Sequence, residues 1–413
     1  MKNIGLNILL IFIFFLSLNS LLAQEIATLS LDDAIKLALK NNPNIVASDA
    51  DIDISEAVVK QAKSAYYPQI SSRIIVPFIG RESGFYLDQL IWDFGRTSNR
   101  VKSSKAILES SKYRKDQTRD NIILNTIIYY YTALSDSHIV VSLDKRVVEA
   151  EKRLEKTEMF FHSGRATELE VARSETELAK IKLDLIKANH NLEISKLNLK
   201  QIVGIEDDVE LELDGVIQYR KIFFDVEESV DQALNTRPEL KALLAIEESN
   251  KANIEVSKKE FYPVIFGRTA YRFEGKGAET PGFIAGVGVK FPIFEGFSRF
   301  GKVQEAKANL RKTKAEKEIA KSDIISEVKQ YFLDLEYAEE NIIVTSKTKD
   351  SSEKTLLLAQ ERYKQDRASE LELAEAESIY EESKTKYMQA LYTYYINVAK
   401  LERATGGIHA PAD

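Results

Sequence analysis

The side chains that could carry out chemistry are few and widely spaced in this chain of 413 residues. The histidines, at positions 138, 162, 190 and 409, show no spacing typical of metal ligands. No cysteine is present to act as a nucleophile, a thiolate ligand or half of a disulfide. No glycine-rich phosphate loop or nucleophile elbow follows a strand-like segment. We therefore expect neither an enzyme nor a site for a metal or a cofactor.

Two segments, 68–95 and 263–301, hold most of the glycines and prolines and also contain charged residues. In both segments apolar and charged residues alternate with the two-residue period of a β-strand. We predict four strands in two hairpins, with one apolar and one charged face on every strand. The charged set is Arg73, Asp88, Arg268, Arg272 and Lys290, and the apolar set is Ile70, Ile74, Val76, Phe78, Phe85, Leu87, Ile91, Ile265, Tyr271, Phe273, Val287, Val289 and Phe291.

A soluble β-sandwich would show the same alternation, so the pattern alone leaves both interpretations open. The predicted strands are about 9 to 11 residues long, which suits a tilted membrane strand. The rest of the chain reads as helix and offers no other sheet to pack upon. Because an open sheet edge in lipid leaves backbone groups unpaired, and the smallest membrane barrels have about eight strands, several copies must pool their strands.

Long helices must position these hairpins. From Thr97 to about Phe161 the chain has neither Pro nor Gly, and apolar residues recur at helical spacing, which predicts one helix of roughly 100 Å. The residues 162–164 end it, and a helix over 167–203 returns for about 55 Å. The returning helix is shorter than the long helix beside it. A third helix, over 44–65, would make up the difference in length if it stacked end to end with the returning helix. The run of three tyrosines at 129–131 is expected to pack in the helical wall and not to bind substrate.

The same order of elements occurs twice. An offset of 195 relates 31–70 to 226–265, and an offset of 202 relates Trp92 to Phe294 and Gly204 to Gly406. We predict a first repeat over 24–204 with a β-hairpin at about 66–95, and a second over 226–407 with a hairpin at about 261–296. The segment 205–225 links them, and 408–413 is expected to be a disordered tail.

The N-terminus indicates export. Residues 1–23 have one basic residue, a short apolar run and a small residue at Ala23, the plan of a cleaved signal peptide. An uncleaved anchor is the alternative, but the apolar run is short for a membrane span. The net charge of −7 argues against nucleic-acid binding.

The doubled order of Ala-Leu-x-x-x-Pro, Tyr-Pro, hairpin, Trp/Phe-Asp/Glu, very long helix, Gly-x-x-(Thr/Ser)-x-Leu turn and returning helix resembles the TolC family of outer-membrane efflux proteins. The resemblance covers 29–407. It implies a mainly helical fold and a homotrimer with a twelve-stranded outer-membrane β-barrel continued by an α-helical periplasmic tunnel. It also implies docking on a periplasmic adaptor protein and an inner-membrane pump, which supplies the energy for export through a passive duct.

The resemblance also implies working residues at the tips of the two long hairpins. Gly164 matches a family turn that needs a positive φ, and Asp366 replaces this glycine in the second tip. The residues that the family pattern assigns to adaptor contact are Ser163, Gly164, Arg165, Thr167, Asp366 and Ser369.

The family narrows its periplasmic entrance with acidic residues three positions apart, and Glu372 and Glu375 occupy those positions. Tyr363 matches a tyrosine of the same latch. Ala368 stands where a latch arginine is expected, and Arg367 lies one position away. A plain solvated acidic helix face is the alternative interpretation of the glutamate pair.

A second class of function is a periplasmic coiled-coil scaffold or adaptor, which also has long helical hairpins. An adaptor would need further domains on either side of one hairpin, whereas this chain shows two hairpins of near-equal length. The expected location is therefore the bacterial outer membrane, with lipid around the hairpins and the helices in the periplasm.

Overall fold

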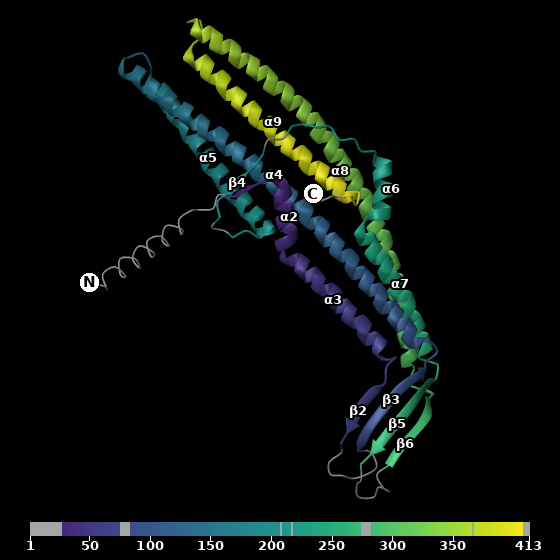
Figure 1. The fold of residues 1–413 in the computed structure, drawn as a ribbon. Helices are drawn as coiled ribbons and strands as arrows, with labels where there is room; N and C mark the ends of the chain where they lie inside the picture. The colour runs from purple at the N-terminus through teal and green to yellow at the C-terminus, as the bar shows by residue number, and fades with distance from the viewer. Residues whose placement is uncertain are drawn as a thin grey trace, which may run out of the picture.

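The structure, a computed structural model, describes residues 27–74, 83–206, 209–215, 218–273, 282–365 and 367–407. The predicted signal peptide and tail lie outside these residues, as do Val76, Phe78 and Asp366. Figure 1 shows one elongated body with a small sheet at one end and the tips of two helical hairpins at the other. The fold is mainly helical and has one four-stranded sheet, as predicted.

Two helices of 67 residues run along this body, α4 (Arg96–His162) and α8 (Ser298–Lys364). Each extends for about 100 Å. Each is followed by a returning helix of about half that length, α5 (Glu168–Val203) and α9 (Glu370–Ala404). These bounds lie within two residues of the predicted ones, because the helices begin and end at sequence signals such as Gly164 and Thr167.

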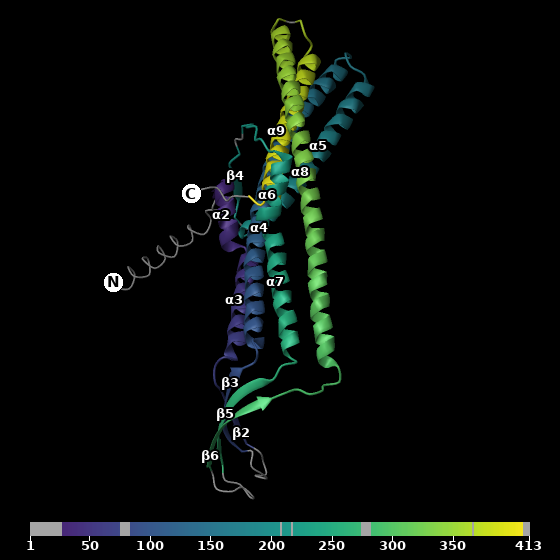
Figure 2. The same cartoon turned by 90° about the vertical axis from the view of Figure 1, so that its right-hand side faces the viewer.

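Shorter helices complete each half. The helices α2 (Leu31–Asn41) and α6 (Val226–Thr236) precede α3 (Pro43–Ser64) and α7 (Pro238–Lys259). A proline opens both α3 and α7, where its missing N–H costs nothing. Figures 1 and 2 show α3 beside the part of α4 nearest the sheet, with α5 beside the part nearest the tip. The two shorter helices thus share one long partner.

The main sheet has the order β2-β3-β5-β6 and is antiparallel throughout. Its strands are β2 (Gln69–Arg73), β3 (Gly84–Trp92), β5 (Val264–Arg272) and β6 (Gly282–Lys290). The first hairpin joins the second through β3 and β5. The edges of the sheet, β2 and β6, therefore come from different halves of the chain.

A second, two-stranded sheet was not predicted. Strand β1 (Ala27–Leu29) pairs in parallel with β4 (Leu211–Leu213), which lies in the segment expected only to link the halves. The buried Tyr130 hydroxyl lies 2.9 Å from the Leu29 carbonyl and 2.5 Å from the Asp214 carbonyl, beside this sheet. The link is thus fastened to α4, in agreement with a packing role for Tyr130.

The hydrophobic core lies midway along the body, where α2 and α6 meet the long helices. It forms two clusters, one for each half, and the Tyr131 ring stacks on that of Tyr392 between α4 and α9 at 5.9 Å. Among the described residues, no helix is both long and apolar enough to cross a membrane.

Candidate functional site

The tip of the first hairpin is a tight turn closed by its own backbone. Gly164 has a φ of +71°, the conformation for which glycine is suited. The Arg165 N–H donates to the Phe160 carbonyl at 2.8 Å. Thr167 caps α5, since its backbone N–H donates to the Glu170 carboxylate at 2.6 Å and its hydroxyl accepts from the Glu170 N–H at 3.3 Å. The turn therefore holds four predicted tip residues in fixed positions: Ser163, Gly164, Arg165 and Thr167.

The tip of the second hairpin contains an ion pair that the sequence analysis missed. Arg362, in the last turn of α8, donates from Nη1 to the Glu372 carboxylate at 2.6 Å and from Nη2 to the Arg367 carbonyl at 3.3 Å. Ser369 caps α9 by accepting the Glu372 N–H at 3.2 Å. Glu372 is thus neutralised inside its own hairpin. A search for a basic residue on the opposite arm of the turn would have found Arg362.

The other acidic residue of the predicted entrance differs from its neighbour. Glu375 is exposed and has no ion-pair partner among the described side chains. Arg367 meets Arg362 through its carbonyl, and no described contact joins its guanidinium to either glutamate. Of the predicted pair, Glu375 therefore retains the uncompensated charge.

A cleft of about 860 Å³ lies between the two hairpin tips. It brings together three of the predicted residues, Arg165 from the first tip and Tyr363 and Ser369 from the second. Phe160 and Leu371 add apolar surface to a lining that also contains charged side chains of both signs. Glu372, Glu375, Ser163, Gly164, Thr167 and Arg367 are not part of this lining. The cleft can accept a partner that offers apolar groups flanked by charges.

At the other end of the molecule, the register places all five predicted lumen residues on one face of the sheet. Arg73 and Arg272 both pair with Gly84, and Asp88 pairs with Arg268 four residues along β3. Lys290 pairs with Val264, four residues from Arg268, and so lies on the same face. The opposite face is mainly apolar, with exposed Ile70, Phe85, Tyr271, Phe283, Val287 and Val289 and half-buried Leu87.

The charged face contains one strong ion pair. Asp88 accepts two hydrogen bonds from the Arg268 guanidinium, at 2.6 Å from Nε and 2.9 Å from Nη2. This two-bond geometry is the one that arginine and a carboxylate prefer. It ties β3 of the first hairpin to β5 of the second.

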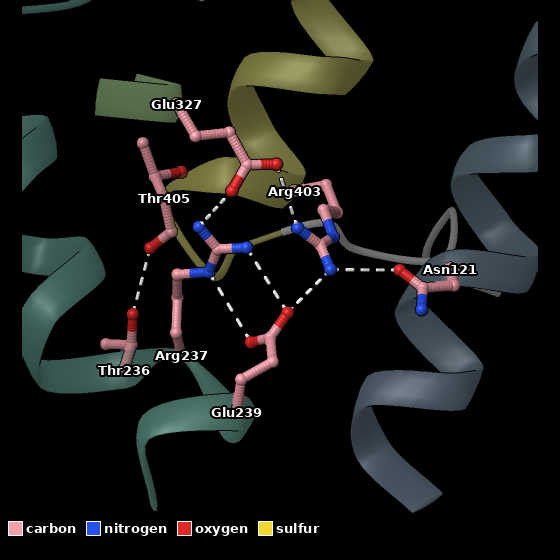
Figure 3. A network of polar contacts seen from close by, with 7 residues as sticks. All are labelled: Asn121, Thr236, Arg237, Glu239, Glu327, Arg403 and Thr405. Carbon is pink, nitrogen blue, oxygen red and sulfur yellow. Dashed lines mark hydrogen bonds and ion pairs between the residues drawn. The ribbon is translucent and has the colours of Figure 1, made fainter. Parts of the chain in front are cut away.

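Midway along the body, a ring of four charges joins α7, α8 and α9 (Figure 3). Arg237 lies 2.5 Å from the Glu327 carboxylate and 3.2 Å from that of Glu239. Arg403 closes the ring, at 2.5 Å from Glu239 and 3.2 Å from Glu327, and also donates to Asn121 of α4 at 3.0 Å. The Arg237 side chain is only 4% exposed. The ring thus fixes the end of α9 against three other helices.

Acidic groups around this ring respond differently to burial. Burial raises the pKa of Glu239, but Arg237 and Arg403 outweigh this effect and hold the pKa below its usual value. Burial raises the pKa of Asp120 to about 6, against the lowering effect of Arg119. Asp120 is therefore partly protonated near neutral pH, whereas Glu239 stays ionised.

The first repeat has no such ring. The repeat offsets convert Arg237, Glu239, Glu327 and Arg403 into neutral amides, namely Asn42, Asn44, Asn125 and Gln201. Asn42 caps α3 with its side-chain oxygen and donates to the Ile202 carbonyl at 3.2 Å. Comparing the repeats position by position would have singled out the ring, because two acids and two bases appear together in one copy only.

Comparisons with known proteins agree with this geometry. Residues 229–407 match the family model described as outer membrane efflux protein. The outer membrane efflux protein BepC of Brucella suis biovar 1 is 21% identical over 340 residues, which cover 78% of this chain and 73% of BepC. The CmeC outer membrane channel of Campylobacter jejuni has a TM-score of 0.79 at 18% identity, over 93% of this chain and 87% of CmeC. The outer membrane protein VceC of Vibrio cholerae has a TM-score of 0.73 at 16% identity, over 91% and 96%.

The ion pair at the second tip yields a prediction about the two glutamates. Because Arg362 already neutralises Glu372, Glu375→Gln should lower the cation-to-anion permeability ratio several-fold, and more than Glu372→Gln does. Reversal potentials under a KCl gradient in planar bilayers measure this ratio. Glu353→Gln, an exposed position on α8, is the matched control. Equal ratios in all four proteins would mean that the glutamates form a plain solvated face.

The charge ring should contribute to stability in the second repeat alone. Arg403→Met leaves Glu239 and Glu327 with Arg237 as their one basic partner in the ring, and should cost about 3 kcal/mol of unfolding free energy. Gln201→Met, the equivalent change in the first repeat, should cost less than about 0.5 kcal/mol at an exposed position. Thermal unfolding in detergent, followed by circular dichroism, compares the two. Similar losses would show that the ring contributes nothing beyond packing.

The raised pKa of Asp120 predicts a stability that depends on pH. The folded pKa of about 6 lies above the unfolded value of about 3.8, so the folded state holds the proton more tightly. The contribution of Asp120 to stability should therefore fall as pH rises from about 4 to 6 and stay low above it. Asp120→Asn removes this loss and should raise the melting temperature at pH 7.5 but leave it unchanged at pH 4. A uniform shift at both pH values would contradict the assignment.

Proposed function

We infer that this chain is a member of the outer membrane efflux protein family, and we propose that it forms the outer-membrane exit duct of an efflux or type I secretion system. One observation carries the proposal. A sheet with an apolar and a charged face lies at the end of the body opposite to the two hairpin tips. Such a chain can set its sheet in the membrane and hold its tips about 100 Å away in the periplasm.

The edges of the sheet support a homotrimer. β2 and β6 each have one neighbour, so each presents one row of unpaired backbone groups that lipid would not satisfy. Four strands are too few to close a membrane barrel, since the smallest such barrels have about eight strands. Three copies would contribute twelve strands and pair β6 of each copy with β2 of the next.

The helices support the same arrangement. Within the chain, α4 of the first repeat packs on α7 of the second. The repeat relation then pairs α8 of one copy with α3 of the next, and both helices carry exposed apolar side chains for this contact. These are Val46 and Ile54 on α3, and Ile319 on α8.

The cleft between the tips supports docking of a periplasmic adaptor protein, which would link the duct to an inner-membrane pump. Its lining combines Phe160 and Leu371 with charged side chains on both hairpins, a surface that an amphipathic helical tip can complement. The duct itself would be passive and would bind no cofactor. Its periplasmic end would be narrowed by the tips, with Glu375 facing the transported solute.

The rival function, a periplasmic scaffold without a barrel, is not favoured. Phe283 and Val287 are 72% and 71% exposed on the apolar face of the sheet. In water, such a face would be a site of aggregation. In an outer membrane, the same face is covered by lipid.

Cysteine cross-linking across the edge strands tests the proposal. Leu87 pairs with Thr269 within the chain, and the repeat offsets convert this pair into Val289 and Ile74 of the next copy. Because opposed Cβ atoms lie about 4.5 to 5.5 Å apart, Val289→Cys with Ile74→Cys should give a covalent trimer on non-reducing gels. The chain has no other cysteine to complicate the pattern.

Val289→Cys with Arg73→Cys is the matched control, since these side chains lie on opposite faces and should not cross-link. The covalent trimer should also fractionate with outer membranes. Recovery of monomers alone, or of the protein in the soluble periplasmic fraction, would overturn the proposal.

A further inference from the structure

Two tight turns join the sheet to the long helices, one directly before α4 and one directly before α8. In each turn the N–H of the last residue donates to the carbonyl of the first, at 3.1 and 3.2 Å. Both central residues have a positive φ, namely Phe94 and Gly95 in the first turn and Gly296 and Phe297 in the second. A phenylalanine is strained in this conformation, whereas glycine is not. Each turn thus contains one strained phenylalanine, and the order of phenylalanine and glycine is reversed between the repeats.

The first turn fits the end of α7 within the same chain. The ring of Phe94 stacks on that of Tyr262 at 5.3 Å and meets that of Trp92 edge-on at 6.1 Å. Beside Gly95 the space is filled, since an added Cβ would lie 3.1 Å from Nζ of Lys259. The strained phenylalanine therefore covers Tyr262, and the glycine makes room for Lys259.

The second turn is largely uncovered in the single chain. The Phe297 side chain is 72% exposed. Its ring contacts in the described structure are with Phe294 at 5.6 Å and Phe300 at 6.2 Å, and both of these side chains are themselves exposed. A Cβ added at Gly296 would have no atom within 4 Å. Strained residues persist where surrounding contacts hold them in place, and here most of the contact surface faces outwards.

The repeat relation indicates which surface covers the second turn. In the proposed trimer, α8 of one copy packs on α3 of the next, as α4 packs on α7 within the chain. The offset of 195 converts Lys259 and Tyr262 into Ser64 and Tyr67, at the end of α3, and both of these side chains are exposed. Ser64 is short where Lys259 is long, so it leaves room for the ring of Phe297. The bulky side chain thus comes from the helix end in one junction and from the turn in the other.

We propose that Phe297 holds one copy of the chain to the next, with its ring packed on Ser64 and Tyr67 at the end of α3 of the neighbouring copy. The partner for this surface is a second copy of the same chain, and the contact lies at the level where the sheet meets the helices. The inference rests on the proposed trimeric duct. The backbone strain in the second turn is offset when the copies assemble.

A double-mutant cycle tests the fit of the two side chains. Phe297→Gly removes the ring, and Ser64→Lys fills the space that the ring needs, so each should lower by several degrees the temperature at which the trimer dissociates in detergent. The combined variant recreates the pair formed by Gly95 and Lys259 and should dissociate at a higher temperature than either single variant. Glycine suits the backbone of the turn, so the loss reports the missing ring. Gel electrophoresis of heated samples measures the dissociation.

A photo-crosslinking residue locates the contact. With p-benzoylphenylalanine in place of Phe297, ultraviolet light should join neighbouring copies, and mass spectrometry should find the bond in the tryptic peptide 64–73. The same residue in place of Phe94 should react within its own chain, near Tyr262, and leave monomers. Phe223→Ala, at an 83% exposed phenylalanine in the segment that links the repeats, is the matched control for the heat measurement and should leave the dissociation temperature unchanged.

The outcomes separate this contact from the trimer on which it depends. If the probe at position 297 labels lipid or its own chain, while Val289→Cys with Ile74→Cys still gives a covalent trimer, the duct stands and the Phe297 contact is overturned. Additive losses in the double-mutant cycle would overturn the contact as well. If the probe and the cysteine pair both give monomers alone, the proposed trimeric duct itself fails.

Discussion

A backbone N–H or C=O group in hydrocarbon must be hydrogen-bonded, and this requirement governs how the chain can be used. The antiparallel ladder gives β3 and β5 a neighbouring strand on both sides, but β2 and β6 each have a neighbour on one side only. These edges come from different repeats, so β6 of one copy could pair with β2 of the next in the way that β3 pairs with β5 within the chain. Figure 2 shows α3 and α8 on opposite sides of the helical body. The helical body and the sheet thus each have two sides on which a neighbouring copy could pack.

The middle of the body is fastened differently in the two repeats. In the second, Arg237 and Arg403 alternate with two glutamates and join four helices. Such a buried ring adds little net stability over apolar packing. Separating its members would leave buried charges without partners, so packing arrangements that move these helices apart are disfavoured. In the first repeat, amides occupy these positions, and the β1–β4 sheet with Tyr130 fastens the chain through backbone groups. The C-terminal end of α9 is thus held by ion pairs, whereas that of α5 accepts hydrogen bonds from the neutral side chains of Asn41 and Asn42.

The sequence predicted the parts of the fold that local patterns determine. The helix expected from 97 to 161 is Arg96–His162, because nothing inside it breaks a helix and Gly164 ends it. Alternation within 264–290 gave the correct faces for the strands. The β1–β4 sheet was missed because three-residue strands, separated by more than 180 positions, leave no periodic pattern. The charge ring was missed because Asn121 and Arg403 are 282 residues apart, and only the fold brings them together.

The entrance of the proposed duct carries less charge than its two glutamates per chain suggest. Arg362 of α8 forms an ion pair with Glu372 of α9 inside one hairpin, so a trimer would present three uncompensated carboxylates at Glu375 in place of six. Because this pair joins the two arms of the turn, it forms only when the tip has its folded geometry. The charge at the entrance therefore depends on the conformation of the tip as well as on the sequence.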